Sequence, residues 1–358
     1  MPRLSGSSRS AGVAGPNAVI GGTFGTVALG LPSPDLDIAG NGGQMKPSLA
    51  AAITKAASKQ TYHTIRFLVD RPLVEDAFRA YAYFRWVDDV IDAVSSNGFD
   101  AGDTERLLRM RFLERQTSLL EACLSGDEPG EVDGHEAMLV ELARDAGRTD
   151  PRLVAYLRHM MLVMAFDVGR RGRLVSAQEL DDYTHWLAVA VAEAMLYFIG
   201  NEAAAPDDET RYAAVSGAHI IHMLRDTHAD VRAGYFNVPR EVLAASSIGP
   251  ADVRCDAYRA WVRDRVLLAR AHFEDGYTYF ARTESRRHRL AGIAYMARFE
   301  WLIETLERNG FTLQEEYADA PSLATGLRMA GHVVSSLVYP RGFRHPGLPV
   351  AATHADRS

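Results

Sequence analysis

The chain has 358 residues, of which 47% are hydrophobic and 24% charged, and its formal net charge is −7 at pH 7. These values are typical of a soluble globular protein that is long enough to bury a large core. The acidic balance and the lack of a stripe of basic and aromatic residues exclude a nucleic-acid binder, and no stretch reaches the roughly 18–20 apolar residues of a membrane span.

The two ends of the chain differ in composition from its middle. Residues 1–45 are rich in Gly, Ala, Ser and Pro, and residues 340–358 contain three prolines, so we expect both segments to be disordered. Cys123 and Cys255 are too few for a disulfide framework, and no signal peptide is visible at the N-terminus, so a cytoplasmic location is expected.

Residues 46–339 are predicted to form one helical domain, because apolar residues recur with helical spacing and no alternation of period two is found. The fold class is therefore all-α, a single-domain helical bundle. The second helix has start signals at Asp70 and Pro72. In chain order, the predicted helices cover residues 46–69, 70–94, 104–124, 135–146, 151–170, 177–200, 206–233, 239–245, 251–282, 287–309 and 323–338.

The second predicted helix carries an acidic stripe near its end. Tyr81, Arg85, Asp88 or Asp89, and Asp92 are three or four residues apart and share one helix face. Like charges at this spacing repel each other, and a hard divalent cation would offset that repulsion. The alternative is a solvated acidic helix end. The apolar residues on both sides favour burial instead, and buried carboxylates need partners.

A second stripe lies on the helix predicted over 206–233. His219, His222, Asp226 and Asp230 again share one face, with Arg225 beside them. Two such stripes facing each other would hold magnesium ions and a diphosphate, and the arginines would add bidentate contacts. Two alternatives are core histidines bonded to backbone and a zinc site made by the two histidines and Asp226. The number of acids favours a harder ion, and no phosphate loop or dinucleotide motif is present.

Four segments together resemble the squalene/phytoene synthase family over about residues 50–320. The resemblance rests on Tyr81-x-x-x-Arg85-x-x-Asp88-Asp89-x-x-Asp92, on Glu179-Leu-x-x-Tyr183-x-x-x-Leu187-Ala188, on Leu224-Arg225-Asp226-x-x-x-Asp230, and on Ala297-Arg298 in the helix before Asn309-Gly-Phe-Thr-Leu313. The first and third segments resemble the two aspartate-rich motifs of that family, and their joint presence in the right order is specific. The resemblance implies an isoprenoid-synthase bundle around a central cavity.

The resemblance also implies the activity and the site. Family members ionise one allylic prenyl diphosphate and couple it head to head with a second one, through a cyclopropyl-carbinyl diphosphate. The implied catalytic residues are Tyr183, Tyr81, Asp88 and Asp226. The implied diphosphate-binding residues are Arg85, Arg225, Arg298 and Thr61. The implied Mg²⁺ ligands are Asp88, Asp89, Asp92, His222, Asp226 and Asp230.

The implied partner is a prenyl diphosphate such as farnesyl or geranylgeranyl diphosphate. Because these substrates are hydrophobic, peripheral contact of the protein with a membrane stays an open question. Use of NADPH and the choice between monomer and homodimer stay open as well. Two other functions are kept. One is a terpene synthase or cyclase of the same fold that acts on a single prenyl diphosphate. The other is a non-catalytic helical protein that binds a lipid or a partner.

Three departures from the family pattern motivate these alternatives. His219 and His222 stand where the family has Gln and Asn. The family has glycines after its central tyrosine, and this chain has larger residues there, within residues 187–193. The last of these residues, Glu193, adds a carboxylate. The family's Gly-Arg-x-Tyr-x-Pro is Gly-Tyr235-Phe-Asn-Val-Pro in this chain, and this change weakens the second diphosphate site.

Overall fold

The structure is a computed structural model that describes residues 48–92, 102–144, 149–200 and 202–317. Within these ranges the regular secondary structure is entirely helical, so the predicted all-α class is confirmed. In chain order the helices are α2 (Leu49–Ala57), α3 (Lys59–Leu68), the 3-10 helix η1 (Arg71–Leu73), α4 (Val74–Asp92), α5 (Gly102–Ser125), α6 (Glu136–Leu142), α8 (Pro151–Arg170), α9 (Ala177–Phe198), α10 (Thr210–Ala233), α11 (Arg240–Ser246), α12 (Asp256–Arg282) and α13 (Arg286–Arg308).

The helix boundaries follow local signals in the sequence. A capping box between Ser176 and Glu179 begins α9, and Gly234, with φ 86°, ends α10 in the left-handed conformation. The helix α12 begins later than the predicted residue 251, because the side chain of Cys255 accepts a hydrogen bond from the Tyr258 N–H and caps the helix there. The helix predicted over 323–338 and the disordered segments predicted over 1–45 and 340–358 lie outside the described residues.

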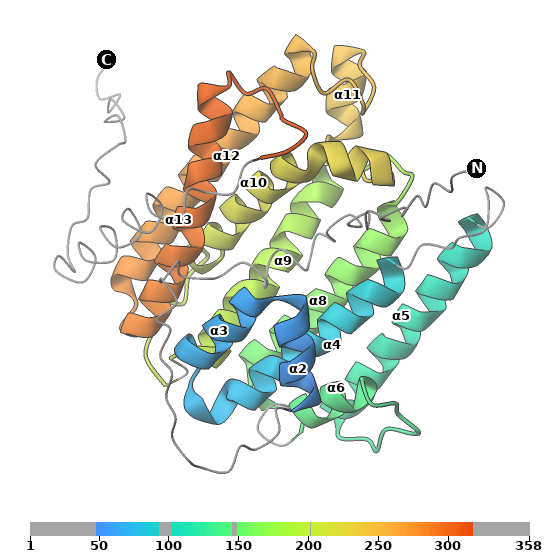
Figure 1. Cartoon of the computed structure of the whole chain (residues 1–358), viewed down its shortest axis with the longest axis vertical. Helices are drawn as coiled ribbons and strands as arrows, with labels where there is room; N and C mark the ends of the chain where they lie inside the picture. Colours follow the sequence, from blue (N-terminus) through green and yellow to red (C-terminus); the bar gives the residue numbers. More distant parts are fainter. Residues whose placement is uncertain (1–47, 93–101, 145–148, 201, 318–358) are drawn as a thin grey trace, which may run out of the picture.

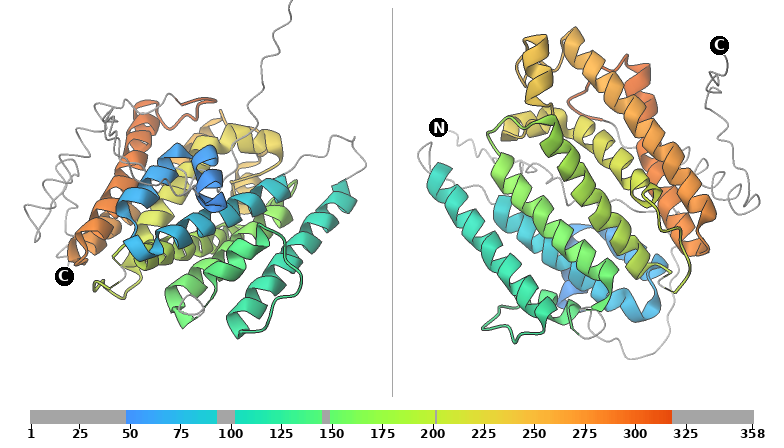
Figure 2. Two further views of the ribbon diagram at one scale, coloured as in Figure 1. Left: turned by 60° about the horizontal axis from the view of Figure 1, so that its bottom comes forward. Right: turned by 180° about the vertical axis from the view of Figure 1, so that it is seen from behind.

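The long helices form a bundle that brings three C-termini to one end (Figure 1). In the interior, α10 packs against α9 and α12, and α9 packs against α8. On one face α2 and α3 cover α4, and α13 lies along α10 and α12 (Figure 2). The helices α4, α8 and α10 all run toward the upper right of Figure 1, and α9 begins near the ends of α8 and α10. The partial negative charges of three helix C-termini therefore gather at that end of the bundle.

None of the described helices is both long enough and apolar enough to cross a membrane.

The contact between α10 and α12 depends on glycine. A Cβ atom at Gly217 of α10 would lie 2.8 Å from the Phe273 ring and 2.9 Å from the backbone oxygen of Ala269 in α12. We expect Gly217→Ala to lower the free energy of unfolding by about 1–3 kcal/mol, because the helices would have to separate. Urea denaturation measures this loss. Gly169→Ala in α8 is the matched control: no atom lies within 4 Å of its added Cβ, so it should stabilise the helix by about 0.5–1 kcal/mol. Equal destabilisation by both changes would contradict this view of the contact.

Candidate active site

The first aspartate stripe lies in the last turn of α4, where no basic residue is present. Asp88 is buried and Asp92 is half-buried, whereas the side chain of Asp89 is 57% exposed. Arg85 hydrogen-bonds both carboxylate oxygens of Asp89 and lies 3.6 Å from Oδ2 of Asp88. Carboxylates at a helix C-terminus are unfavourable unless a cation is near. Because Asp88 and Asp92 are less exposed than Asp89, they are the members of this stripe that face the interior.

Burial raises the pKa of the Asp88 carboxyl to about 8, and the negative charges of Asp92, Asp167 and Asp89 add to this effect while Arg85 opposes it. Oδ2 of Asp88 is buried and accepts no hydrogen bond from the residues that the structure describes. Burial also raises the pKa of Asp92, and the negative charge of Asp167 raises it further. A buried carboxylate without a hydrogen-bond partner is costly, so this pair suits a bound cation.

The second stripe occupies the last turns of α10, and its two aspartates have different surroundings. Asp230 is buried, and burial together with the charge of Asp226 raises its pKa to about 7. Asp226 is half-buried, and burial alone would raise its pKa. Hydrogen bonds from Arg225, at 2.7 and 2.8 Å, and the nearby His222 lower the pKa of Asp226 instead.

The two histidines of the second stripe are both buried. Burial and the charge of Arg225 lower the pKa of His222 to about 4, so its ring is neutral at pH 7, and its Nε2 accepts a hydrogen bond from Arg225. Neither ring nitrogen of His219 has a hydrogen-bond partner in the described part of the chain, and its ring lies edge-on to Tyr183 with centroids 4.8 Å apart. Among the described side chains, no three of His, Cys, Asp or Glu are arranged closely enough to hold one ion.

A buried hydrogen-bond network, which the sequence analysis missed, joins Tyr183 to the second stripe. The Tyr183 hydroxyl donates to Oδ2 of Asp167 at 3.0 Å, and Nε of Arg170 donates to Oδ1 of the same carboxylate at 2.7 Å. Nη1 of Arg170 then donates to Oδ1 of Asn237 at 2.8 Å, and Nδ2 of Asn237 donates to Asp230 at 2.7 Å. The Arg170 side chain is fully buried, so this network is shielded from solvent.

Asp167 lies between the two stripes. Its negative charge contributes to the raised pKa of Asp88 and Asp92 on α4 and also to the raised pKa of Asp230 on α10. Tyr235, just after α10, is also close to both Asp92 and Asp167: burial and the charges of these two carboxylates raise the pKa of Tyr235 to about 12. The structure thus brings the inward carboxylates of both stripes to one end of the bundle, around one buried ion pair on α8.

Residues 54–323 match the squalene/phytoene synthase family. The chain belongs to this family. Among solved structures, it is similar to the squalene synthase HpnC from Alicyclobacillus acidocaldarius, with a TM-score of 0.59, 20% sequence identity, and coverage of 74% of this chain and 94% of that chain. It is also similar to a dehydrosqualene synthase in complex with ligand, with a TM-score of 0.56, 16% identity, and coverage of 81% and 95% of the two chains. No curated protein matches the sequence.

Membership of the squalene/phytoene synthase family makes the chain an isoprenoid synthase of the prenyltransferase kind. The two solved structures are below 25% identical to it, and they show the common fold alone.

The remaining predicted site residues of this synthase surround the stripes. Tyr81 is buried on α4. Burial raises its pKa, which the charge of Arg85 and a hydrogen bond with Thr61 oppose. Thr61 is buried on α3, and its hydroxyl donates to Ser58 at 3.0 Å. Arg298 of α13 is half-buried, and its positive charge lowers the pKa of Asp226, so it lies on the side of the second stripe.

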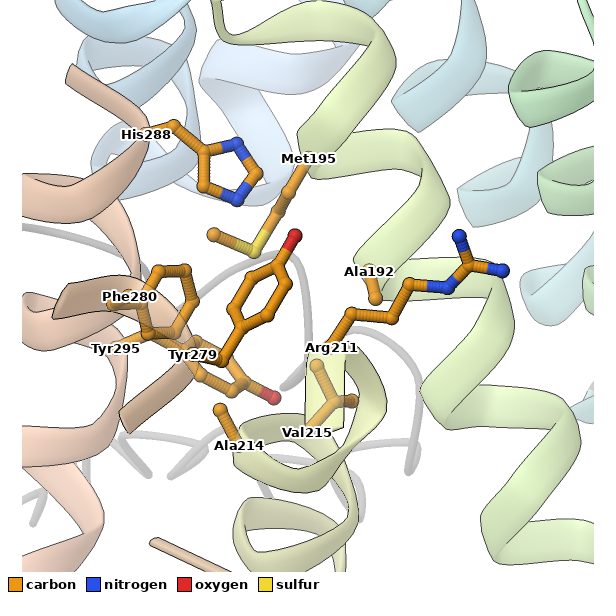
Figure 3. A pocket seen from close by; sticks show the side chains of 9 residues that line it. All are labelled: Ala192, Met195, Arg211, Ala214, Val215, Tyr279, Phe280, His288 and Tyr295. Atoms are coloured by element: carbon orange, nitrogen blue, oxygen red, sulfur yellow. The ribbon is translucent and has the colours of Figure 1, made fainter. Parts of the chain in front are cut away.

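The residues that replace the family's glycines, 187–193, lie in the second half of α9, away from the start of this helix. Ala192 lines a pocket of about 270 Å³, counting space open to solvent, between α9, α10, α12 and α13, and Tyr279 and Tyr295 form part of its wall (Figure 3). Beside it, the buried Glu193 accepts a hydrogen bond from the Tyr212 hydroxyl at 3.0 Å. The enclosed space within it is only about 10 Å³, room for about one water molecule, and is far smaller than the roughly 300–1,000 Å³ of most ligand sites. Glu193 is thus part of the far end of the bundle and not of the aspartate site.

Proposed function

We propose that this synthase is a Mg²⁺-dependent prenyltransferase that ionises an allylic prenyl diphosphate and condenses it head to head with a second one. The observation that carries the proposal is the pair of buried carboxylates, Asp88 and Asp230, whose pKa values are raised to about 8 and about 7 on two helices that converge at Asp167. Ionisable groups perturbed in this way cluster at functional sites. Family membership supports the reaction class.

Asp88 and Asp92 on one stripe, and Asp226 and Asp230 on the other, are the residues that would hold Mg²⁺ ions, with oxygens of the bound diphosphate supplying the ligands that the protein side chains alone do not. The orphaned Oδ2 of Asp88 and the position of both stripes at helix C-termini fit a hard divalent cation. Bound Mg²⁺ would stabilise the negative charge that builds up on the departing diphosphate. His222 would be available as a further ligand only after its Nε2 has lost the hydrogen bond from Arg225.

The arginines of the two stripes would bind the diphosphate by exchanging partners. Arg85 is bonded to the exposed Asp89, and Arg225 to the half-buried Asp226. Planar guanidinium groups bind carboxylates and phosphates with the same bidentate geometry. We propose that diphosphate oxygens replace these carboxylates and that the freed Asp226 then serves the metal. Arg298 and Thr61 would complete the contacts from α13 and α3.

Two tyrosines would act on the hydrocarbon side of the reaction. Tyr183 and Tyr81 are both buried, so their rings are shielded from water that would quench an allylic cation. Aromatic faces stabilise such a cation without bonding to it. The Tyr183 ring stacks on Phe166 with centroids 4.8 Å apart, and its hydroxyl proton is held by Asp167. Tyr183 could therefore take a proton from the hydrocarbon only by passing its own hydroxyl proton to the Asp167 carboxylate.

The alternative function is that of a terpene synthase acting on one prenyl diphosphate. The small pocket at Ala192 favours this alternative, because the pocket leaves little room for a second prenyl chain in the second half of α9.

The deciding experiment is incubation of the pure protein with farnesyl or geranylgeranyl diphosphate and Mg²⁺, with and without NADPH, followed by analysis of the extracted products. We expect thirty- or forty-carbon hydrocarbons or their cyclopropyl diphosphates. A cyclic or hydroxylated single-unit product would establish the alternative, and no release of diphosphate from either substrate would overturn both.

A further inference from the structure

Arg171 is fixed between the ends of α8 and α10. The turn that follows α8 is joined to the end of α10 by a backbone hydrogen bond, in which the N–H of Gly172 donates to the oxygen of Gly234 at 2.8 Å. Both glycines have positive φ, 74° and 86°, a conformation that other residues rarely adopt. Nε of Arg171 donates to the Ala233 oxygen, the last residue of α10, at 3.3 Å. The α8 turn therefore holds this guanidinium against the helix that carries the second stripe.

The Arg171 guanidinium also lies near the first stripe. The guanidinium carbon is 5.9 Å from the centroid of the Tyr235 ring, and the backbone N–H of Tyr235 donates to the backbone oxygen of Asp230 at 2.8 Å. On the other side, burial and Asp167 raise the pKa of Asp92, and the positive charge of Arg171 opposes them. Arg171 therefore lies against the end of α10 and beside Tyr235, near enough to Asp92 for its charge to act on that carboxyl.

Arg171 differs from the other arginines of this region in its partners. Arg85 is bonded to Asp89, Arg225 is bonded to Asp226, and Arg109 lies 3.5 Å from Glu105. Arg171 is exposed, and in the described part of the chain it makes no ion pair with a carboxylate. Among the described residues its one hydrogen bond uses Nε, so both terminal nitrogens are left to bind another acceptor. A guanidinium that is held in place but not neutralised is suited to bind an anion.

We propose that Arg171 binds the diphosphate of a prenyl substrate between the two aspartate stripes, with the Tyr235 ring as the surface on which its guanidinium rests. This inference rests on the proposed function and adds a residue to it. Tyr235 is the position at which the sequence departs from the arginine of the family pattern. The guanidinium comes from the turn after α8 instead, so the second diphosphate site does not lack its cation.

Binding of inorganic pyrophosphate to the full-length protein in the presence of Mg²⁺, measured by calorimetry, tests the proposal without relying on turnover. Arg171→Met keeps the aliphatic stem and removes the charge, and we expect it to raise the Kd of pyrophosphate about 10- to 100-fold, the effect of losing hydrogen bonds to a charged group. Arg171→Lys should restore part of the affinity. The matched control is Arg263→Met, because this arginine is 57% exposed on α12 and, among the described residues, forms an ion pair only with the adjacent Asp264, at 3.5 Å.

Three results would overturn the inference. If Arg171→Met binds pyrophosphate with the wild-type Kd, Arg171 does not contact the diphosphate, and the proposed function is unaffected. If Arg263→Met weakens binding as much as Arg171→Met does, the effect is one of net charge and not of position. If the wild-type protein binds no pyrophosphate with Mg²⁺, the proposed function fails and this inference fails with it. The melting temperature of each variant shows that the folded protein is being compared.

Discussion

Replacing Asp88 by asparagine is expected to reduce turnover of prenyl diphosphates by about 10²–10³-fold and to make the protein more stable when neither substrate nor Mg²⁺ is bound. The loss of turnover follows from the proposed role of this carboxylate at the departing diphosphate. The gain in stability follows from its burial, because Oδ2 of Asp88 has no hydrogen-bond partner and the charged form is penalised.

The stability gain has a defined pH dependence. The pKa of Asp88 is about 8 in the folded protein, above the value of about 4 for an unfolded chain. A raised pKa means that the folded state binds the proton more tightly than the unfolded state. The stabilisation is complete below about pH 4 and is lost as the pH rises through about 8. The wild-type protein should therefore lose stability between these values, by a few kcal/mol from this residue, whereas Asp88→Asn should lose less.

Urea denaturation at pH 5 and pH 8, without Mg²⁺, measures the stability effect, and product formation measures turnover. Asp264→Asn is the control, because this carboxylate is 67% exposed on α12 and should change neither property. An Asp88→Asn protein that is less stable than wild type at pH 8 would contradict our account of this carboxylate. Full turnover by the same variant would remove Asp88 from the proposed site.

The second large effect is expected at the buried ion pair on α8. Asp167→Ala should lower the free energy of unfolding by about 3–5 kcal/mol, because it leaves the guanidinium of Arg170 buried without its carboxylate. Arg170 is 1% exposed, and it also loses the contact that orients it toward Asn237. Tyr183 loses the acceptor of its hydroxyl as well. Chemical denaturation of the variant measures the whole loss.

A double-mutant cycle separates the ion pair from simple loss of packing. The variant carrying both Asp167→Ala and Arg170→Met should be destabilised by less than the sum of the two single changes, by about 1–3 kcal/mol, because no buried charge is left unpaired. The surface pair of Arg158 and Glu121 is the control: two hydrogen bonds join its side chains, against one in the buried pair, but they are 52% and 46% exposed, so its cycle should give less than about 1 kcal/mol. Additive effects at Asp167 and Arg170 would show that the pair is not coupled.

The two stripes could be predicted from the sequence because helical spacing places residues on a common face without any knowledge of the fold. The same rule left Asp88 and Asp89 equivalent, and only the packing of α4 shows that Asp88 is buried while Asp89 faces solvent. Asp167 and Arg170 are three residues apart at the end of an apolar helix, which is a weaker form of the same signal. Their partner Asn237 is 67 residues away from Arg170, and no local pattern predicts such a contact.

The central claim is that carboxylates from both stripes jointly gather divalent ions at one prenyl diphosphate. The most direct test is an anomalous difference map from crystals grown with Mn²⁺, as a substitute for Mg²⁺, and a non-hydrolysable farnesyl thiodiphosphate. We predict manganese peaks beside Asp88 and Asp92 and also beside Asp226 and Asp230, with the diphosphate group between them. Manganese bound to one stripe alone, or a diphosphate bound away from both stripes, would contradict the claim.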